Sequence, residues 1–164
     1  MNDPMTMLKA DHRDVKRMLE TLADSEEGKE REQLANELNA ALSLHMTLEE
    51  SLVYPLIKEE LGSEDEEEAQ IEHQLAREGL QKLMSMVDVP GFGAAVEMLK
   101  GGILHHVEEE ETELLPELTS ALPREKWLAL GDAIARGKAD AGAPVKPRQS
   151  TRRSAKRRTV SAKK

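Results

Sequence analysis

Four histidines and two glutamates occur at matching spacings in this sequence. One histidine is followed 33 residues later by a second, and a glutamate follows four residues after that. The same unit recurs at an offset of 61 residues, which indicates an internal duplication. The six residues are His12, His45 and Glu49 in the first copy, and His73, His106 and Glu110 in the second.

These residue types together predict a metal centre. Buried side by side without a cation, two carboxylates and four imidazoles would cost several kcal/mol, although a network of His–Glu pairs is an alternative. Six ligands exceed the four of a closed zinc site and suit two transition-metal ions bridged by carboxylates. Nitrogen and oxygen ligands without sulfur fit iron or manganese, and the residues alone do not choose between them.

The elements that must position these residues are helices. Apolar residues recur at three- and four-residue steps, and each of the four histidines fills a position in such a stripe near the middle of its helix. Each glutamate lies one turn beyond its histidine on the same face. We therefore predict an all-α, antiparallel up-down four-helix bundle with the six side chains in one inward-facing layer. The expected helices span residues 4–23, 29–61, 63–87 and 92–118, with a short fifth helix at 123–138.

Several local signals mark the helices. Asp3 and Pro4 suit the start of the first helix, and Ser63–Glu66 reads as a capping box for the third. Pro55 predicts a kink or the end of regular helix after the first His-x3-Glu motif. Gly101 and Gly102, inside the fourth helix, suggest a close approach of a neighbouring helix.

Composition sets the wider frame. Hydrophobic residues make up 38% and aromatic residues 2%, which is typical of an aliphatic helical core. The absence of cysteine fits a reducing, cytoplasmic setting, and no apolar run is long enough to cross a membrane. Residues 142–164 carry nine Lys/Arg and no acid, whereas the other 141 residues carry a net charge of −18. We expect a bundle domain over residues 1–138 and a disordered basic tail over 139–164.

The tail suggests a second kind of partner. Its Lys/Arg content is typical of arms that bind nucleic acid, and it has no aromatic residue that could stack on bases. Any binding through residues 146–164 would therefore be driven by phosphates and insensitive to sequence. The alternative is a tail that improves solubility or folds back on acidic stretches.

The motifs also carry a family resemblance. A lone His12, HMTLEE at 45–50, a lone His73 and HVEEEE at 106–111 followed by LLP resemble the hemerythrin-like (HHE cation-binding) family over residues 5–118. The resemblance implies a four-helix bundle with two irons joined by an oxo or hydroxo group. It implies that His12 and His45 bind one iron, that His73 and His106 bind the other, and that Glu49 and Glu110 bridge them.

The sequence departs from oxygen-carrying hemerythrins at two positions. Arg77 stands where those proteins have a second histidine four residues after the third-helix histidine, and Glu110 follows His106 by four residues rather than five. The missing histidine frees coordination positions and disfavours reversible oxygen carriage. We expect a protein that handles oxygen, hydrogen peroxide or nitric oxide, with catalase-like peroxide decomposition favoured. The alternative is a non-catalytic iron or redox sensor or regulator that acts through a partner or through nucleic acid bound by its basic tail.

The remaining candidates are predicted to lie outside the centre. His105 is about 100° around the helix from His106, which makes it a surface residue or an outer neighbour of the site. The acidic residues around Glu110 are expected to be a solvated face, and Tyr54 to be part of the packing. These acidic residues are Glu108, Glu109, Glu111 and Glu113.

Overall fold

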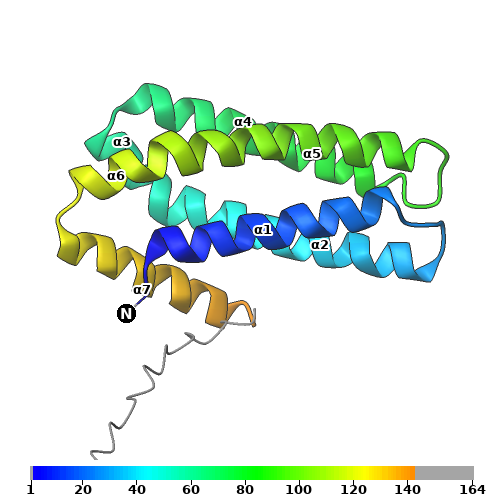
Figure 1. Cartoon of the computed structure of the whole chain (residues 1–164), viewed down its shortest axis with the longest axis horizontal. Helices are drawn as coiled ribbons and strands as arrows, with labels where there is room; N and C mark the ends of the chain where they lie inside the picture. Colours follow the sequence, from blue (N-terminus) through cyan, green and yellow to red (C-terminus); the bar gives the residue numbers. More distant parts are fainter. Residues whose placement is uncertain (1, 143–164) are drawn as a thin grey trace, which may run out of the picture.

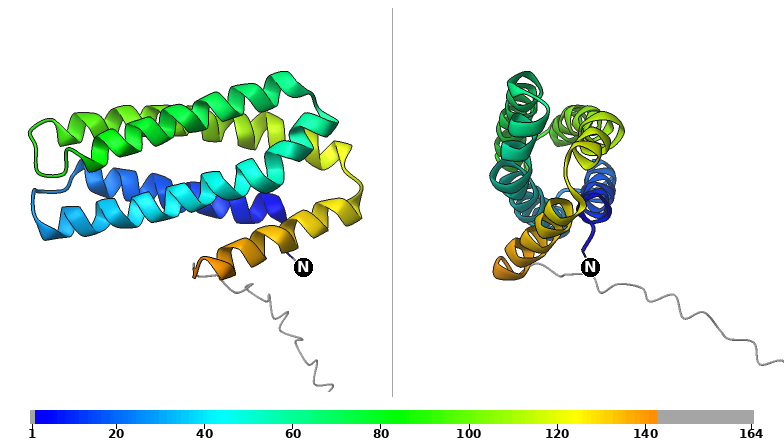
Figure 2. Two further views of the ribbon diagram at one scale, coloured as in Figure 1. Left: turned by 180° about the vertical axis from the view of Figure 1, so that it is seen from behind. Right: turned by 90° about the vertical axis from the view of Figure 1, so that its left-hand side faces the viewer.

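The structure is a computed structural model that describes residues 2–142. Its elements are α1 (Pro4–Ala23), α2 (Lys29–Leu48), the π-helical turn η1 (Glu49–Val53), α3 (Tyr54–Glu60), α4 (Ser63–Met84), α5 (Phe92–Glu109), the π-helical turn η2 (Glu110–Leu114), α6 (Leu115–Ala121) and α7 (Arg124–Asp140). Four long helical rods surround a common axis, and α7 lies outside them (Figures 1 and 2). The predicted fold class, a helical bundle with a short fifth helix, is confirmed.

The helix starts follow the sequence in one case and depart from it in another. The Asp3 side chain accepts a hydrogen bond from the Thr6 N–H at 2.8 Å, and Pro4 occupies the first helical position. The capping box expected at Ser63–Glu66 is wrong. Ser63 is already helical, Gly62 precedes it at φ 135°, and no side chain caps this end. Glycine tolerates that conformation without strain, so the backbone turn itself starts α4.

A π-helical turn interrupts the second and fourth rods directly at each His-x3-Glu motif. In η1 the N–H of Tyr54 donates to the carbonyl of Glu49, five residues back, before Pro55. In η2 the N–H of Leu115 donates to Glu110 in the same way, before Pro116. Proline has no N–H and its ring clashes with the carbonyl four residues earlier, so the helix widens by one residue at this point. The predicted kink at Pro55 is therefore a local widening after which the helix continues.

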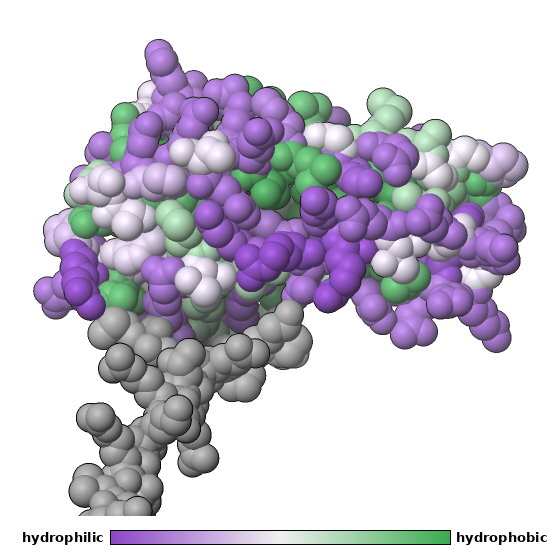
Figure 3. Space-filling view, in the orientation of Figure 1, coloured by the Kyte–Doolittle hydropathy of each residue, from purple (hydrophilic) through white to green (hydrophobic). Residues whose placement is uncertain are grey.

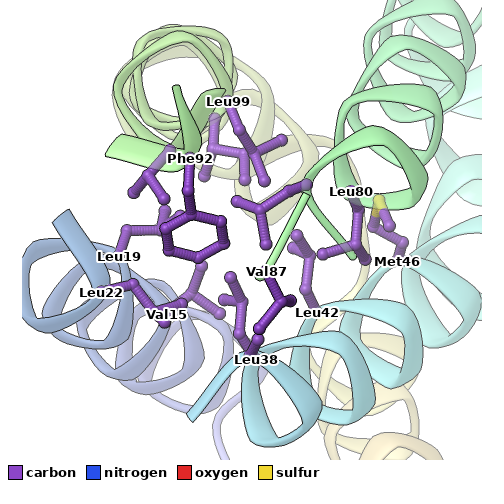
Figure 4. Close-up of a cluster of buried hydrophobic side chains, with 14 residues drawn as sticks. Val15, Leu19, Leu22, Leu38, Leu42, Met46, Leu80, Val87, Phe92 and Leu99 are labelled. Carbon is purple, nitrogen blue, oxygen red and sulfur yellow. The ribbon is translucent and has the colours of Figure 1, made fainter. Parts of the chain in front are cut away.

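Two apolar clusters lie on either side of the histidine layer. One is formed toward the α1–α2 and α4–α5 loops by residues such as Leu19, Leu38 and Phe92 (Figure 4). The other is formed by α3, α6, α7 and the helix ends near them, and includes Tyr54 and Trp127. The polar layer is therefore enclosed by hydrophobic core, where a charge without a partner would be costly.

Helix α7 packs against the bundle at very short range. A Cβ atom at Gly131 would collide with the backbone of Asn2, and one at Gly137 would collide with the Leu48 side chain. The Trp127 indole N–H donates to Asp3 Oδ1 at 3.0 Å. These contacts fix α7 beside α1 and the end of α2.

The outer surface is mostly hydrophilic on the face drawn in Figure 3. Within residues 2–142, no helix is long and apolar enough to cross a membrane. The predicted disordered tail, and the predicted binding of nucleic acid through residues 146–164, concern residues that lie almost entirely outside the described part and stay predictions.

Candidate metal centre

The four rods bring the six predicted residues into one buried layer. Each rod supplies one histidine, and the two glutamates are the first residues of η1 and η2. None of the six is more than 7% exposed, and both glutamates are fully buried. The histidines come from α1, α2, α4 and α5: His12, His45, His73 and His106.

The histidines form two pairs, each within one half of the duplication. The Nε2 atoms of His12 and His45 lie 3.1 Å apart, and those of His73 and His106 also lie 3.1 Å apart. Two nitrogens that bind one ion through bonds of about 2.1 Å, meeting near a right angle, would be about 3.0 Å apart. Each pair thus has the spacing of two ligands to a single ion.

Glu49 spans both pairs. Its Oε1 lies 3.1 Å from Nε2 of His45 and 3.7 Å from Nε2 of His12. Its Oε2 lies 3.2 Å from Nε2 of His73 and 4.0 Å from Nε2 of His106. One oxygen therefore faces each pair, which is the arrangement of a carboxylate that bridges two ions.

Glu110 is placed less symmetrically. Its Oε2 lies 3.3 Å from Nε2 of His12 and 3.8 Å from Nε2 of His106, so the same oxygen approaches both pairs. Neither oxygen of Glu110 lies within ion-pair distance of His45 or His73 in the described part of the chain. Glu49 is therefore the better placed of the two bridging candidates.

The carboxylates in this layer lack hydrogen-bond partners. None of the four oxygens of Glu49 and Glu110 has a well-aligned hydrogen bond within residues 2–142, despite the short distances to the imidazoles. A buried charged oxygen without a partner is rare and costly in native proteins. Two cations placed between the histidine pairs would satisfy these oxygens, so the donor set fits metal ions.

The electrostatics of the layer point the same way. Burial opposes a charge on His12, but the carboxylates of Glu110 and Glu49 outweigh it and raise the pKa of His12 to about 10. The same balance raises the pKa of His45 to about 9 and that of His106 to about 10. Burial also opposes a charge on Glu49, but the imidazoles, His45 foremost, hold its pKa well below the usual range. The layer attracts positive charge, which protons or metal ions can supply.

Comparisons with known proteins agree with this geometry. The sequence profile of the hemerythrin HHE cation-binding domain matches residues 3–118. This chain belongs to the hemerythrin HHE cation-binding family. An uncharacterised hemerythrin-like protein of Schizosaccharomyces pombe is 35% identical over 101 residues, covering 59% of this chain and 50% of the relative. This chain therefore aligns with about half the length of that relative.

A solved structure shares the fold. The crystal structure of a hemerythrin HHE cation-binding domain-containing protein from Mycobacterium kansasii superposes with a TM-score of 0.76. The match covers 87% of this chain and 89% of the other, at 23% sequence identity. The matched 87% of this chain is longer than the stretch of residues 5–118 that carries the histidine and glutamate motifs.

In this hemerythrin-family chain, carboxylates also surround the layer from outside. The outward Nδ1 atom of three histidines donates a hydrogen bond to a carboxylate. His12 donates to Glu111 at 2.8 Å, His73 to Glu50 at 2.9 Å and His106 to Glu72 at 2.6 Å. For His45, Asp11 lies 3.5 Å from Nδ1 without a well-aligned hydrogen bond. A proton held on Nδ1 leaves the inward Nε2 lone pair free for a metal and orients the ring.

These outer residues were missed in the sequence, and the solvated position expected for Glu111 is wrong. The repeat contained the signal. Asp11 and Glu72 are related by the 61-residue offset, and so are Glu50 and Glu111. Each of these four carboxylates directly precedes or follows a predicted ligand in the sequence, so the duplicated unit includes its supporting carboxylates.

A basic group in turn contacts each outer carboxylate. Lys138 of α7 forms an ion pair with Asp11, and Lys9 lies 3.7 Å from Glu111. Arg77 donates to both oxygens of Glu50 at 2.9 and 2.8 Å. Arg77 therefore holds a carboxylate that orients a predicted ligand, at the position where oxygen carriers have another histidine.

His105 completes this outer ring. It is 63% exposed, and its Nε2 lies 3.5 Å from Glu72 and 3.2 Å from Glu109. The expected location outside the layer agrees with the structure, and His105 neighbours the site through the carboxylate that supports His106.

Tyr54 is more than the packing residue that the sequence suggested. It is fully buried, and its hydroxyl donates to Nε2 of His73 at 2.8 Å. Burial and the surrounding carboxylates, Glu49 foremost, raise its pKa, so the phenol keeps its proton. A metal that bound His73 Nε2 would take the lone pair that this hydroxyl uses, and the O–H would then be free to donate elsewhere.

A small cavity adjoins the histidine layer. Its volume is about 20 Å³, enough for a water-sized molecule. All four inward histidines line it, together with apolar side chains that include Val15, Leu42, Met46, Ile103 and Val107. A molecule in this cavity would contact the metal-binding layer on one side and hydrocarbon on the other.

Proposed function

We propose that this chain is a non-haem di-iron protein that handles a small oxygen or nitrogen species, with hydrogen peroxide as the favoured substrate. The observation that carries the proposal is the position of Glu49, with one oxygen facing each histidine pair, beside a cavity of about 20 Å³. Two ions bridged in this way, next to room for one small molecule, suit chemistry on oxygen, hydrogen peroxide or nitric oxide.

Each residue has a defined part in this proposal. The four inward Nε2 atoms would hold the metal, and Glu49 and Glu110 would bridge the two ions. When bound, a pair of irons supplies a two-electron redox change at the edge of the cavity. The outer carboxylates keep the protons on Nδ1 and so fix the rings in their binding orientation. Tyr54 keeps a proton at its hydroxyl oxygen and can donate a hydrogen bond into the layer.

Peroxide decomposition fits this site and needs no added reductant. Two molecules of hydrogen peroxide give two of water and one of dioxygen, so one molecule is oxidised and the other reduced. Arg77 binds Glu50 and is thus committed outside the layer, and no histidine occupies its position as an additional ligand. Fewer protein ligands leave positions on the metal for exogenous molecules.

The test is oxygen evolution by protein loaded anaerobically with iron. We expect about two irons per chain, as in the bridged carboxylate sites of helical bundles, and peroxide-dependent oxygen release that is lost in His106→Ala. The exposed His105→Ala should keep its iron and activity. A loaded protein with two irons and no oxygen release would contradict peroxide decomposition, and a single zinc per chain would contradict the di-metal site.

A sensor function is the second candidate, favoured by the contact between the layer and α7. Lys138 on α7 forms an ion pair with Asp11, which stands beside His45. Metal occupancy at His45 could therefore alter how α7 is held against the bundle. Iron-dependent protection of α7 from hydrogen exchange, without peroxide turnover, would favour the sensor over the enzyme.

A further inference from the structure

The cavity beside the metal-binding layer adjoins a surface groove between α4 and α5. The groove has a volume of about 730 Å³ and is lined mostly by small and apolar residues. Cavity and groove share four lining residues, which form a common boundary that we name the Gly102 opening: Glu72, Ala76, Gly102 and Ile103. The groove thus reaches from solvent to the wall of the cavity.

Gly102 lies on this boundary and has open space beside it. A Cβ atom added there would meet nothing within 4 Å, and the same holds for its neighbour Gly101. The close helix approach that the sequence suggested at these two glycines is therefore wrong, because they border open space. Gly102 lines both the groove and the cavity, whereas Gly101 lines neither. Glycine is less favourable than alanine inside a helix, so the open space at Gly102 comes at the expense of helix stability.

The duplication provides an internal comparison. Shifted by 61 residues, Gly102 corresponds to Ala41 and Ala76 corresponds to Val15. The half of the bundle that carries His12 and His45 thus has larger side chains at these two positions of the opening. Of the two halves, the α4–α5 half has the smaller residue at both positions.

Charge at the opening selects the kind of molecule that would pass. Glu72 is held there by His106, which donates to it at 2.6 Å, and the described body is strongly acidic. Anions would be repelled from a narrow passage beside a carboxylate. The exposed apolar residues of the groove, Leu75 and Met98, present a surface suited to small neutral molecules.

We propose that the Gly102 opening is the route by which a small neutral molecule, such as hydrogen peroxide, dioxygen or nitric oxide, reaches the metal-binding layer. The proposal rests on the proposed function, because it assumes that the layer binds iron and takes an exogenous ligand. It assigns Gly102 the task of controlling access, with no contact to the metal.

The test compares Gly102→Leu with Gly101→Leu, the same substitution one residue away. Nitric oxide is the probe, mixed anaerobically with reduced, iron-loaded protein and followed by absorbance. A leucine at 102 should fill the opening and slow nitric oxide binding by about tenfold or more, because a closely packed wall admits small molecules only through fluctuations. Gly101→Leu should bind nitric oxide at the rate of the unaltered protein.

The nitric oxide affinity at equilibrium shows whether slower binding comes from a blocked passage or from a damaged metal site. A blocked passage slows association and dissociation by the same factor, so the nitric oxide affinity, the iron content and the spectrum stay unchanged. Gly102→Ala, which also favours the helix, should give a smaller slowing and serves if the leucine variant fails to fold or load. Equal rates in Gly101 and Gly102 variants that hold full iron would overturn the proposal, as would an altered affinity with unaltered association.

The outcome separates the opening from the function. If the unaltered protein binds nitric oxide but releases no oxygen from peroxide, while Gly102→Leu slows nitric oxide binding, the access route stands and peroxide decomposition fails. If the unaltered protein decomposes peroxide and both leucine variants bind nitric oxide at equal rates, the function stands and the access route fails. If iron-loaded protein binds no nitric oxide, the layer has no open position and the proposal is overturned.

Discussion

Removal of the metal should lower the stability of the bundle by an amount that the site geometry makes large. Without a cation, the four carboxylate oxygens of Glu49 and Glu110 remain buried without well-aligned hydrogen bonds. Protonated imidazoles can compensate part of this charge, because the pKa values of three histidines are raised to about 9 or 10. We therefore expect the metal-free protein to fold but to unfold at a lower temperature than the loaded protein.

The size of the Tm shift follows from the coupling between metal binding and folding. A ligand that binds only the folded state, at a free concentration of 100 Kd, adds about 2.7 kcal/mol per site, or about 5.4 kcal/mol for two sites. Unfolding entropy is about 2.1 cal/mol/K per residue, which gives about 0.3 kcal/mol/K for a body of about 140 residues. The Tm should therefore rise by about 9 °C for one ion and about 18 °C for two.

Calorimetry with and without iron under anaerobic conditions measures the shift. Glu49→Gln should abolish most of it, because this carboxylate faces both histidine pairs. Glu108→Gln, which removes an exposed charge on α5, should retain it in full. Identical melts of loaded and metal-free protein would refute the reasoning, because the six side chains would then not form a cage whose filling stabilises the fold.

Three further predictions follow from the contacts. Elemental analysis should find that Glu49→Gln loses more iron than Glu110→Gln, since Glu49 lies within 4.0 Å of all four inward nitrogens and Glu110 approaches two; equal losses would contradict the bridging role of Glu49. Lys138→Met should speed iron release to a chelator by up to about tenfold, because the ion pair with Asp11 supports a predicted ligand, and Lys138→Arg should restore retention. The stability of the metal-free protein should fall as pH rises from about 6.5 toward 10, because raised histidine pKa values stabilise the fold below the unfolded value and lose this effect above the folded one. Thermal melts of the loaded protein should lack this fall, because the metal replaces the protons.

The layer could be predicted because two kinds of information coincided. The 61-residue repeat selected His106 over the adjacent His105, and the apolar stripes placed the selected residues on inward faces. Helical periodicity then required the glutamates four residues later to share those faces. Fold class and the composition of the layer follow from spacing alone, because spacing fixes which side chains of a helix share a face.

The outer carboxylates were missed, although the same 61-residue offset relates Asp11 to Glu72 and Glu50 to Glu111. Regular α-helical geometry gave no reason to separate Glu111 from the solvated glutamates around it, so the repeat alone marked this residue. The π-helical turn that starts at Glu110 changes the register at this point, and Glu111 meets His12 on a different rod. The proline signal predicted a disturbance but not which residue it would bring inward. The space at Gly102 likewise depends on the distance between two helices, which a sequence pattern does not contain.

The duplication also shows where the two halves have diverged. Tyr54 contacts His73, whereas the residue that corresponds to it in the second copy is Leu115, which carries no polar group. Helix α7 covers the side of His45 through Lys138, whereas the side of His106 meets exposed His105 and the groove. The hydroxyl donor and the opening thus both belong to the His73–His106 pair. If two ions occupy the layer, the one at this pair would lie on the side of the groove, and the one at His12 and His45 would lie on the side of α7.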